Sequence, residues 1–82
     1  MPTVYREKGY RFVIYTNDHH PPHVHVQKAG SEARVAIDPI EVIENWGYNQ
    51  REIKTILEIM AENQDTFIKA WNEYHAESGE GE

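Results

Sequence analysis

Residues 23–38 read HVHVQKAGSEARVAID, and the predicted sheet is built around this segment. Polar and apolar residues alternate on both sides of its centre, and this period of two is typical of half-buried β-strands. Between the alternating segments, Ala29-Gly30 suits the two-residue loop of a β-hairpin. The stretch therefore predicts an antiparallel hairpin whose strands run from His23 to Lys28 and from Glu32 to Asp38.

The two-residue loop also sets the pairing, because residues at equal distance from it lie opposite each other and a slip by one residue would exchange the two faces. The valines then share one side of the hairpin, and both histidines lie on the other side with Arg34. The predicted pairs are Val26–Ala33, His25–Arg34, Val24–Val35 and His23–Ala36. The apolar side needs a second layer of structure to cover it.

A third strand is predicted ahead of the hairpin. Residues 10–16, YRFVIYT, are rich in aromatic and β-branched side chains, and the turn-forming pair Asn17-Asp18 follows them. By the same alternation, Phe12 and Ile14 join the apolar face of the hairpin. The opposite side of this strand carries Arg11, Val13 and Tyr15. We therefore expect a small three-stranded antiparallel sheet.

The back half of the chain predicts helix. Asn49 and Glu52 have the spacing of a capping box, with Asn as the N-cap. Apolar residues then recur at helical intervals up to His75. We expect one long helix from Asn49 to His75, or two helices if Asn63–Asp65 forms a break. A short helical segment opened by Pro39 is expected before it.

These elements give an α+β fold class, in which the long C-terminal helix packs on one face of the three-stranded sheet. We expect a single domain over residues 1–76 and a disordered acidic tail over residues 77–82. Trp46 is expected to cap the core edge, and the alternative is an exposed aromatic anchor for a partner. The residues expected to be nearly buried are Val24, Val35, Leu57, Met60 and Trp71.

Composition narrows the possible functions. The 82 residues contain no cysteine, which excludes disulfides and thiolate metal sites. The absence of a long apolar run and of a signal peptide predicts a cytoplasmic protein with no membrane partner. The formal net charge of −6 argues against a broad nucleic-acid surface. The net charge still allows a small basic groove, which would be built from Arg6, Lys8, Arg11, Lys28 and Arg34.

Four of the five histidines lie within residues 18–26, DHHPPHVHV. Neutral imidazole is the commonest protein metal ligand, and His23 and His25 project from one side of their strand. They could hold Zn²⁺, Ni²⁺ or another divalent transition metal. The candidates for a third ligand are His19 and Asp18, with His20 and the distant His75 as further choices. The plainer interpretation is a rigid turn, because consecutive prolines restrict the chain.

A metal-free site is the other chemical hypothesis. Of His23 and His25, one imidazole could act as general base, and the other could stabilise an oxyanion or phosphate together with Arg34, as in small RNA-cleaving domains. Arg34 could instead be a solvated cross-strand partner of His25 or of an acidic residue. The sequence contains no Ser-His-Asp spacing, no glycine-rich phosphate loop and no zincin helix motif.

Several segments together resemble the small prokaryotic family known as domain of unknown function 4160. They are Gly9-Tyr10-Arg11-Phe12, residues 18–26, Gly47-Tyr48 and Trp71-Asn72-Glu73-Tyr74. The resemblance covers residues 1 to about 75 and implies a bacterial or phage-borne protein. It also implies a gene often placed beside another small gene, as in toxin–antitoxin pairs. It implies no catalytic residue, and His20 lies at the family's variable position.

The functional expectation is a small partner-binding protein, one component of a toxin–antitoxin-like two-gene module, which acts through its His-rich hairpin surface. Its partner would be a small protein encoded by an adjacent gene. Two alternatives remain open: an RNase-like hydrolase, with or without metal, that uses the same histidines, and an acidic inhibitor that mimics nucleic acid.

Overall fold

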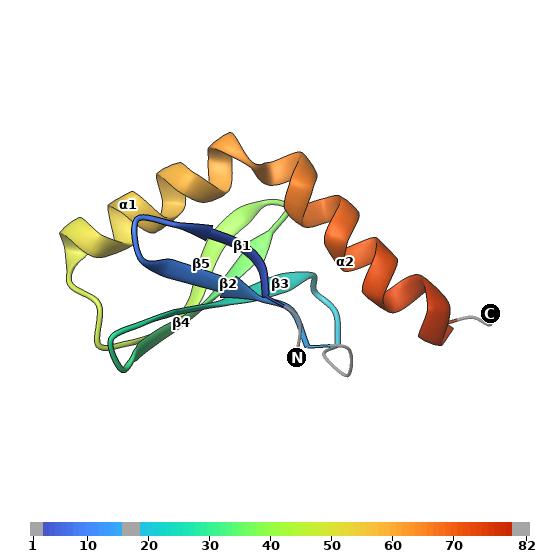
Figure 1. Ribbon diagram of the computed structural model, residues 1–82, viewed down its shortest axis with the longest axis horizontal. Coiled ribbons are helices and arrows are strands. Elements are labelled where there is room, and N and C mark those ends of the chain that lie inside the picture. Colours follow the sequence, from blue (N-terminus) through green and yellow to red (C-terminus); the bar gives the residue numbers. More distant parts are fainter. Residues whose placement is uncertain (1–2, 16–18, 80–82) are drawn as a thin grey trace.

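The computed structural model describes residues 3–15 and 19–79, the last four by their backbone alone. Five consecutive strands form one antiparallel meander in the order β1-β2-β3-β4-β5, and two helices follow. Figure 1 shows both helices on the same side of the sheet, with α2 running on beyond it. The elements are β1 Thr3–Glu7, β2 Tyr10–Val13, β3 His23–Lys28, β4 Ser31–Ile37, β5 Ile40–Trp46, α1 Gln50–Glu62 and α2 Gln64–Gly79.

The central hairpin has the predicted register. β3 and β4 pair through all four predicted residue pairs, from His23–Ala36 to Val26–Ala33. Their loop, Ala29-Gly30, has φ values of 50° and 85°, which fit a tight two-residue turn. A second turn of the same kind, Lys8-Gly9, joins β1 to β2 with φ values of 54° and 84°. In an antiparallel meander these two turns lie at the same end of the sheet.

The predicted α+β class is confirmed. The prediction of a three-stranded sheet was wrong, because β1 and β5 complete a sheet of five strands. The segment opened by Pro39 is strand β5 rather than helix. Ile40 and Val42 face the core beside β4, but the register then shifts and leaves Ile43 out of phase and exposed. β1 has a similar irregularity between Thr3 and Tyr5. Such bulges break the alternation by which strands are recognised.

The second helical alternative is confirmed, since the chain forms two helices that break at Asn63. Asn49 is the N-cap of α1, and its capping box with Glu52 is complete. At the break, the Asn63 side chain donates to the carbonyl of Ile59. The α2 backbone is helical through Gly79, beyond the expected start of a tail. The last three residues of that tail lie outside the described residues.

The core lies between the helices and the valine face of the sheet. Val24, Val35 and Met60 are fully buried and Trp71 is 2% exposed, as predicted, whereas Leu57 is only partly buried. The expectation that Trp46 caps the core was wrong, because 49% of this residue is exposed. The tryptophan follows the bulge of β5, where alternation directs it to the side of the sheet away from the helices.

Candidate functional site

The candidate site is the face of the sheet opposite the helices, which we call the outer face. Two rows of paired residues cross it. The row nearer the tight turns is Arg6, Arg11, Gln27, Glu32 and Trp46, and the next row is Val13, His25, Arg34 and Glu44. We call the region around His23 and His25 the histidine end and the region around Arg6 and Arg11 the arginine end.

The histidine end is largely buried. His23 and His25 are 7% and 8% exposed, and their ring centroids lie 5.2 Å apart. The ring of Tyr15 meets His25 edge-on at 4.6 Å. On the other side His23 meets Trp71 of α2 at 5.5 Å. The two histidines therefore lie on the outer face, as predicted, but offer little surface for contact with another molecule.

Trp71 is the centre of this ring cluster. The imidazole of His75, one helical turn further along α2, stacks on Trp71 at 3.7 Å with 18° between the planes. His20 reaches the same indole at 5.8 Å. Four of the five histidines thus belong to one cluster of aromatic rings. The sequence indicated that Trp71 would be buried, but it gave no sign that α2 would bring this residue to the histidine segment.

Hydrogen bonds fix the orientation of both strand histidines. The Nδ1 atom of His23 donates to the carbonyl oxygen of Pro21 at 2.8 Å. The Nδ1 atom of His25 lies 3.2 Å from a carboxylate oxygen of Glu32, which accepts a hydrogen bond from it. In metal sites, a bond of this kind orients the other ring nitrogen toward the ion. The ring orientations of His23 and His25 are therefore set by these hydrogen bonds.

The remaining predicted metal ligands do not complete a site within the described residues. No group of three His, Asp or Glu residues suited to a metal occurs in residues 3–15 and 19–75. His19 is exposed, and Asp18 lies outside the described residues. Binding of Zn²⁺ or another transition metal stays a prediction.

The three predicted catalytic residues are neighbours in the sheet, but Arg34 is directed away from the histidines. It lies on β4, between His25 on β3 and Glu44 on β5. Its guanidinium pairs with Glu44 at 3.2 Å and lies 6.0 Å from the ring centre of Trp46. The structure therefore brings His23 and His25 together and places Arg34 with the exposed tryptophan instead.

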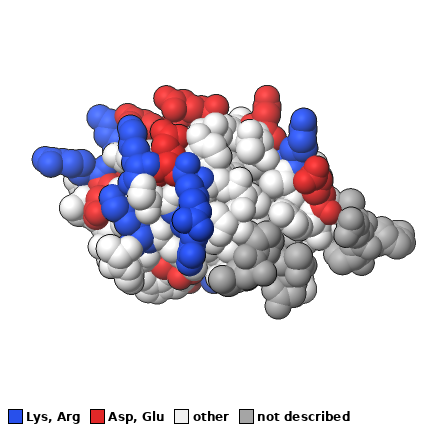
Figure 2. All heavy atoms as spheres, viewed as in Figure 1, with Lys and Arg blue, Asp and Glu red and all other residues white. Residues whose placement is uncertain are grey.

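The arginine end is open, and part of the basic groove expected from the sequence is present there. A pocket of about 440 Å³ lies against the two tight turns and is lined by Arg6, Arg11 and Lys28. Lys8 lies in the first turn, and its carbonyl accepts a bond from Lys28. Arg34 does not line the pocket. Figure 2 shows several Lys and Arg side chains gathered over this end of the sheet.

A line of hydrogen bonds connects the two ends of the outer face. Arg11 donates to the side-chain oxygen of Gln27 at 2.6 Å. Gln27 donates in turn to Glu32 and to the Tyr15 hydroxyl, both at 3.4 Å. Glu32 also accepts from His25. The outer face is thus one connected polar surface that is covered at one end and accessible at the other.

A family model described as Domain of unknown function (DUF4160) matches residues 9–72. The chain belongs to this family. The match confirms the resemblance found in the sequence, and it runs from the first tight turn to just beyond Trp71. Comparison of this DUF4160 chain with curated proteins and with solved structures gave no significant match. Neither helix, over its described residues, has the length and apolar character needed to cross a membrane.

Proposed function

We propose that this protein binds a small protein partner, as one component of a toxin–antitoxin-like two-gene module, and that Trp46 on the outer face is its main contact residue. The two-gene arrangement is what resemblance to the DUF4160 family implies. The partner would be the product of the adjacent gene. The proposal retains the polar side of the sheet as the interaction surface. It places the main contact on Trp46 of β5 instead of on the histidines of β3.

The exposure of Trp46 is the observation that carries the proposal. Trp46 is 49% exposed and Ile43 is 41% exposed, and both lie on β5, at the edge of the sheet. Tryptophan and arginine are enriched among the residues that dominate binding energy in protein interfaces. Here Arg34 lies beside Trp46 and is held by Glu44. An aromatic side chain on the edge strand β5, paired with a cationic side chain on the adjacent strand β4, suits a protein interface.

The burial of the histidines favours binding over hydrolysis. A general base must come within hydrogen-bond reach of its substrate, and His23 and His25 expose less than a tenth of their surface. The net charge of −6 also opposes encounters with polyanionic RNA. Both observations support the partner-binding hypothesis against the RNase-like one.

The test is co-expression of the tagged protein with the product of the adjacent gene, followed by purification and measurement of the dissociation constant. Trp46→Ala is expected to weaken binding by about thirtyfold or more, which is the loss of roughly 2 kcal/mol typical of a dominant contact residue. Arg51→Ala, an exposed substitution on α1, is the control and should leave affinity unchanged.

Two results would contradict the proposal. One is failure of the co-expressed proteins to form a complex. The other is a complex whose affinity is the same for wild type and Trp46→Ala, which would place the contact elsewhere. Cleavage of RNA by the purified protein, lost in His25→Ala, would favour the hydrolase alternative instead.

A further inference from the structure

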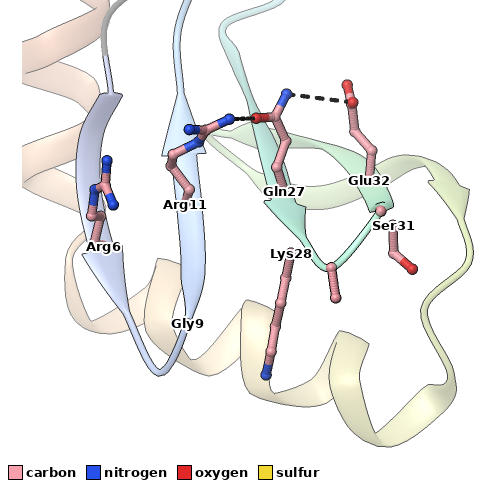
Figure 3. A pocket seen from close by; sticks show the side chains of 9 residues that line it. Arg6, Gly9, Arg11, Gln27, Lys28, Ser31 and Glu32 are labelled. Atoms are coloured by element: carbon pink, nitrogen blue, oxygen red, sulfur yellow. Dashed lines mark hydrogen bonds between the residues drawn. The ribbon is translucent and has the colours of Figure 1, made fainter.

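The pocket at the arginine end is formed by two hairpins lying side by side. The lining residues flank the Lys8-Gly9 and Ala29-Gly30 turns. These turns join β1 to β2 and β3 to β4 at the same end of the sheet. Figure 3 shows Arg6, Arg11, Gln27 and Glu32 in a row across these strands, with Lys28 directed toward the turn that contains Gly9. The lining residues are Arg6, Gly9, Arg11, Gln27, Lys28, Ala29, Gly30, Ser31 and Glu32.

The charge of this lining is opposite to that of the chain. The pocket has three cationic side chains and one anionic side chain, a net charge of +2, whereas the whole chain carries −6. Arg6 and Arg11 are directly paired across β1 and β2. Like charges in that position destabilise a sheet. The chain has fourteen carboxylates, yet this arginine pair has no carboxylate partner among the described residues.

The contacts that these cations make leave their charge uncompensated. Arg11 donates to a neutral amide, that of Gln27. The Lys28 ammonium donates to the Lys8 carbonyl at 3.3 Å and lies 4.4 Å from the centre of the Tyr10 ring. No hydrogen bond or ion pair joins the Arg6 side chain to a described residue. The one carboxylate of the lining, Glu32, is shared with His25 and Gln27.

We propose that this pocket binds the phosphate group of a small molecule. A phosphate monoester carries a charge of about −1.5 to −2 at neutral pH, which matches the combined charge of the two guanidinium groups of Arg6 and Arg11. A single dianion between Arg6 and Arg11 compensates both guanidinium groups, whereas one carboxylate compensates only one. Guanidinium groups present a fork of donors that suits phosphate oxygens.

The size and the charge of the molecule indicate the source of the phosphate. The pocket volume of about 440 Å³ falls within the range of roughly 300–1,000 Å³ that is usual for small-molecule sites. A bare phosphate ion would fill only part of it. A long nucleic acid would meet the acidic remainder of the surface and be repelled. The expected ligand is therefore a compact phosphorylated molecule of nucleotide size. This inference does not depend on the proposed partner.

The experiment is an NMR titration of the isotope-labelled protein at constant ionic strength, following the arginine side-chain Nε–H signals and the backbone amides of both turns. The probes are inorganic phosphate, adenosine monophosphate, a 5′-phosphorylated RNA hexamer and a hexaglutamate peptide. Phosphate and adenosine monophosphate should give saturable shifts at Arg6, Arg11 and Gly30. The nucleotide should bind more tightly than the ion if the phosphate belongs to a larger molecule.

Three variants make the titration specific. The double variant Arg6→Gln/Arg11→Gln should weaken binding of adenosine monophosphate by at least about tenfold, because charge-assisted hydrogen bonds are lost. Arg51→Gln on α1 is the matched control and should bind as wild type does. Glu32→Gln should tighten binding by about two- to fivefold, because it removes the anionic side chain from the lining.

Several outcomes would overturn the inference. Shifts that rise without saturation, or that are equal in the double variant and in Arg51→Gln, would show only screening of surface charge. Tighter binding of hexaglutamate than of either phosphate compound would assign the pocket to acidic peptides. Tighter binding of the RNA hexamer would assign it to nucleic acid. Each result is read on the isolated protein, so failure here leaves the partner test unaffected.

Discussion

The two ends of the outer face differ in access although they belong to the same sheet. At the histidine end, His23 and His25 are enclosed by Tyr15 and by Trp71 of α2. At the arginine end, Arg6 is exposed and a pocket lies beside it. The two histidines, whose chemistry is common in catalysis, are therefore buried. The arginines remain accessible to ligands.

The difference comes from where the helices lie. α1 and α2 cover the valine face, but α2 continues past the sheet (Figure 1) and places Trp71 against the start of β3. The opposite end of the sheet has the two tight turns Lys8-Gly9 and Ala29-Gly30. Substitutions at the histidine end should thus reduce stability, and those at the arginine end should affect binding alone.

The largest expected effect follows from Trp71→Ala. Trp71 is 2% exposed and joins the core to the histidine rings, so its removal should lower the free energy of unfolding by about 3–5 kcal/mol. Urea denaturation followed by circular dichroism measures this. The matched tryptophan variant, Trp46→Ala, should change stability by no more than about 0.5 kcal/mol, because its site is exposed. Equal losses in the two variants would refute the division between enclosed and open regions.

The next effect in size is that of His23→Ala. The variant loses the hydrogen bond to the Pro21 carbonyl and the packing against Trp71, and we expect a loss of about 1–3 kcal/mol in the free energy of unfolding. The same denaturation assay applies, with His19→Ala as the exposed control. A wild-type unfolding curve for His23→Ala would mean that this histidine is not a packing residue.

Tyr48 gives a prediction about pH. Its hydroxyl lies 3.0 Å and 3.1 Å from the carbonyl oxygens of Val26 and Ser31. Burial, together with the nearby Tyr10 and Glu52, raises the pKa of Tyr48 to about 12. The fold thus favours the neutral hydroxyl, compared with a pKa of about 10 in the unfolded chain. This contribution to stability is complete below pH 10 and disappears as the pH rises toward 12.

The variant Tyr48→Phe isolates that contribution. It should cost about 1 kcal/mol at neutral pH for the lost hydrogen bonding, and its stability should fall less steeply than that of wild type above pH 10. Denaturation curves at several alkaline pH values make the comparison. Identical slopes in the two proteins would mean that Tyr48 does not hold the β3–β4 hairpin through its hydroxyl.

The smallest expected effect is that of Arg6→Gln. Arg6 is exposed and opposes another arginine, so neutralising it should leave stability unchanged to within about 0.5 kcal/mol or raise it slightly. Thermal unfolding at low salt, where surface repulsion is least screened, provides the measurement. A clear loss of stability would show that Arg6 has a structural role at the arginine end.

Much of the fold could be predicted from residues 23–38 and from Asn49 with Glu52. Within residues 23–38 the polar–apolar alternation is unbroken, and at Asn49 and Glu52 the capping pattern is complete. The structure has the predicted register and the predicted cap. Strands β1 and β5 could not be found in this way, because each contains an irregularity that breaks the period of two. The same shift explains the unexpected exposure of Trp46.

The site was harder to predict than the fold, because it depends on contacts between distant segments. The sequence placed His23 and His25 on the polar side of their strand, which the structure bears out. Their burial depends on Trp71, almost fifty residues away, and no local pattern reports such a contact. The basic groove could be expected only as a possibility, since it needs β1 beside β2 to bring Arg6 next to Arg11.

One NMR measurement compares the solvent access of the two ends of the outer face. An uncharged gadolinium chelate added to the protein enhances the relaxation of protons that solvent can approach. We expect strong enhancement at the Nε protons of Arg6 and Arg11 and weak enhancement at the ring protons of His23 and His25. Enhancement at the two histidines equal to that at the arginines would contradict this expectation.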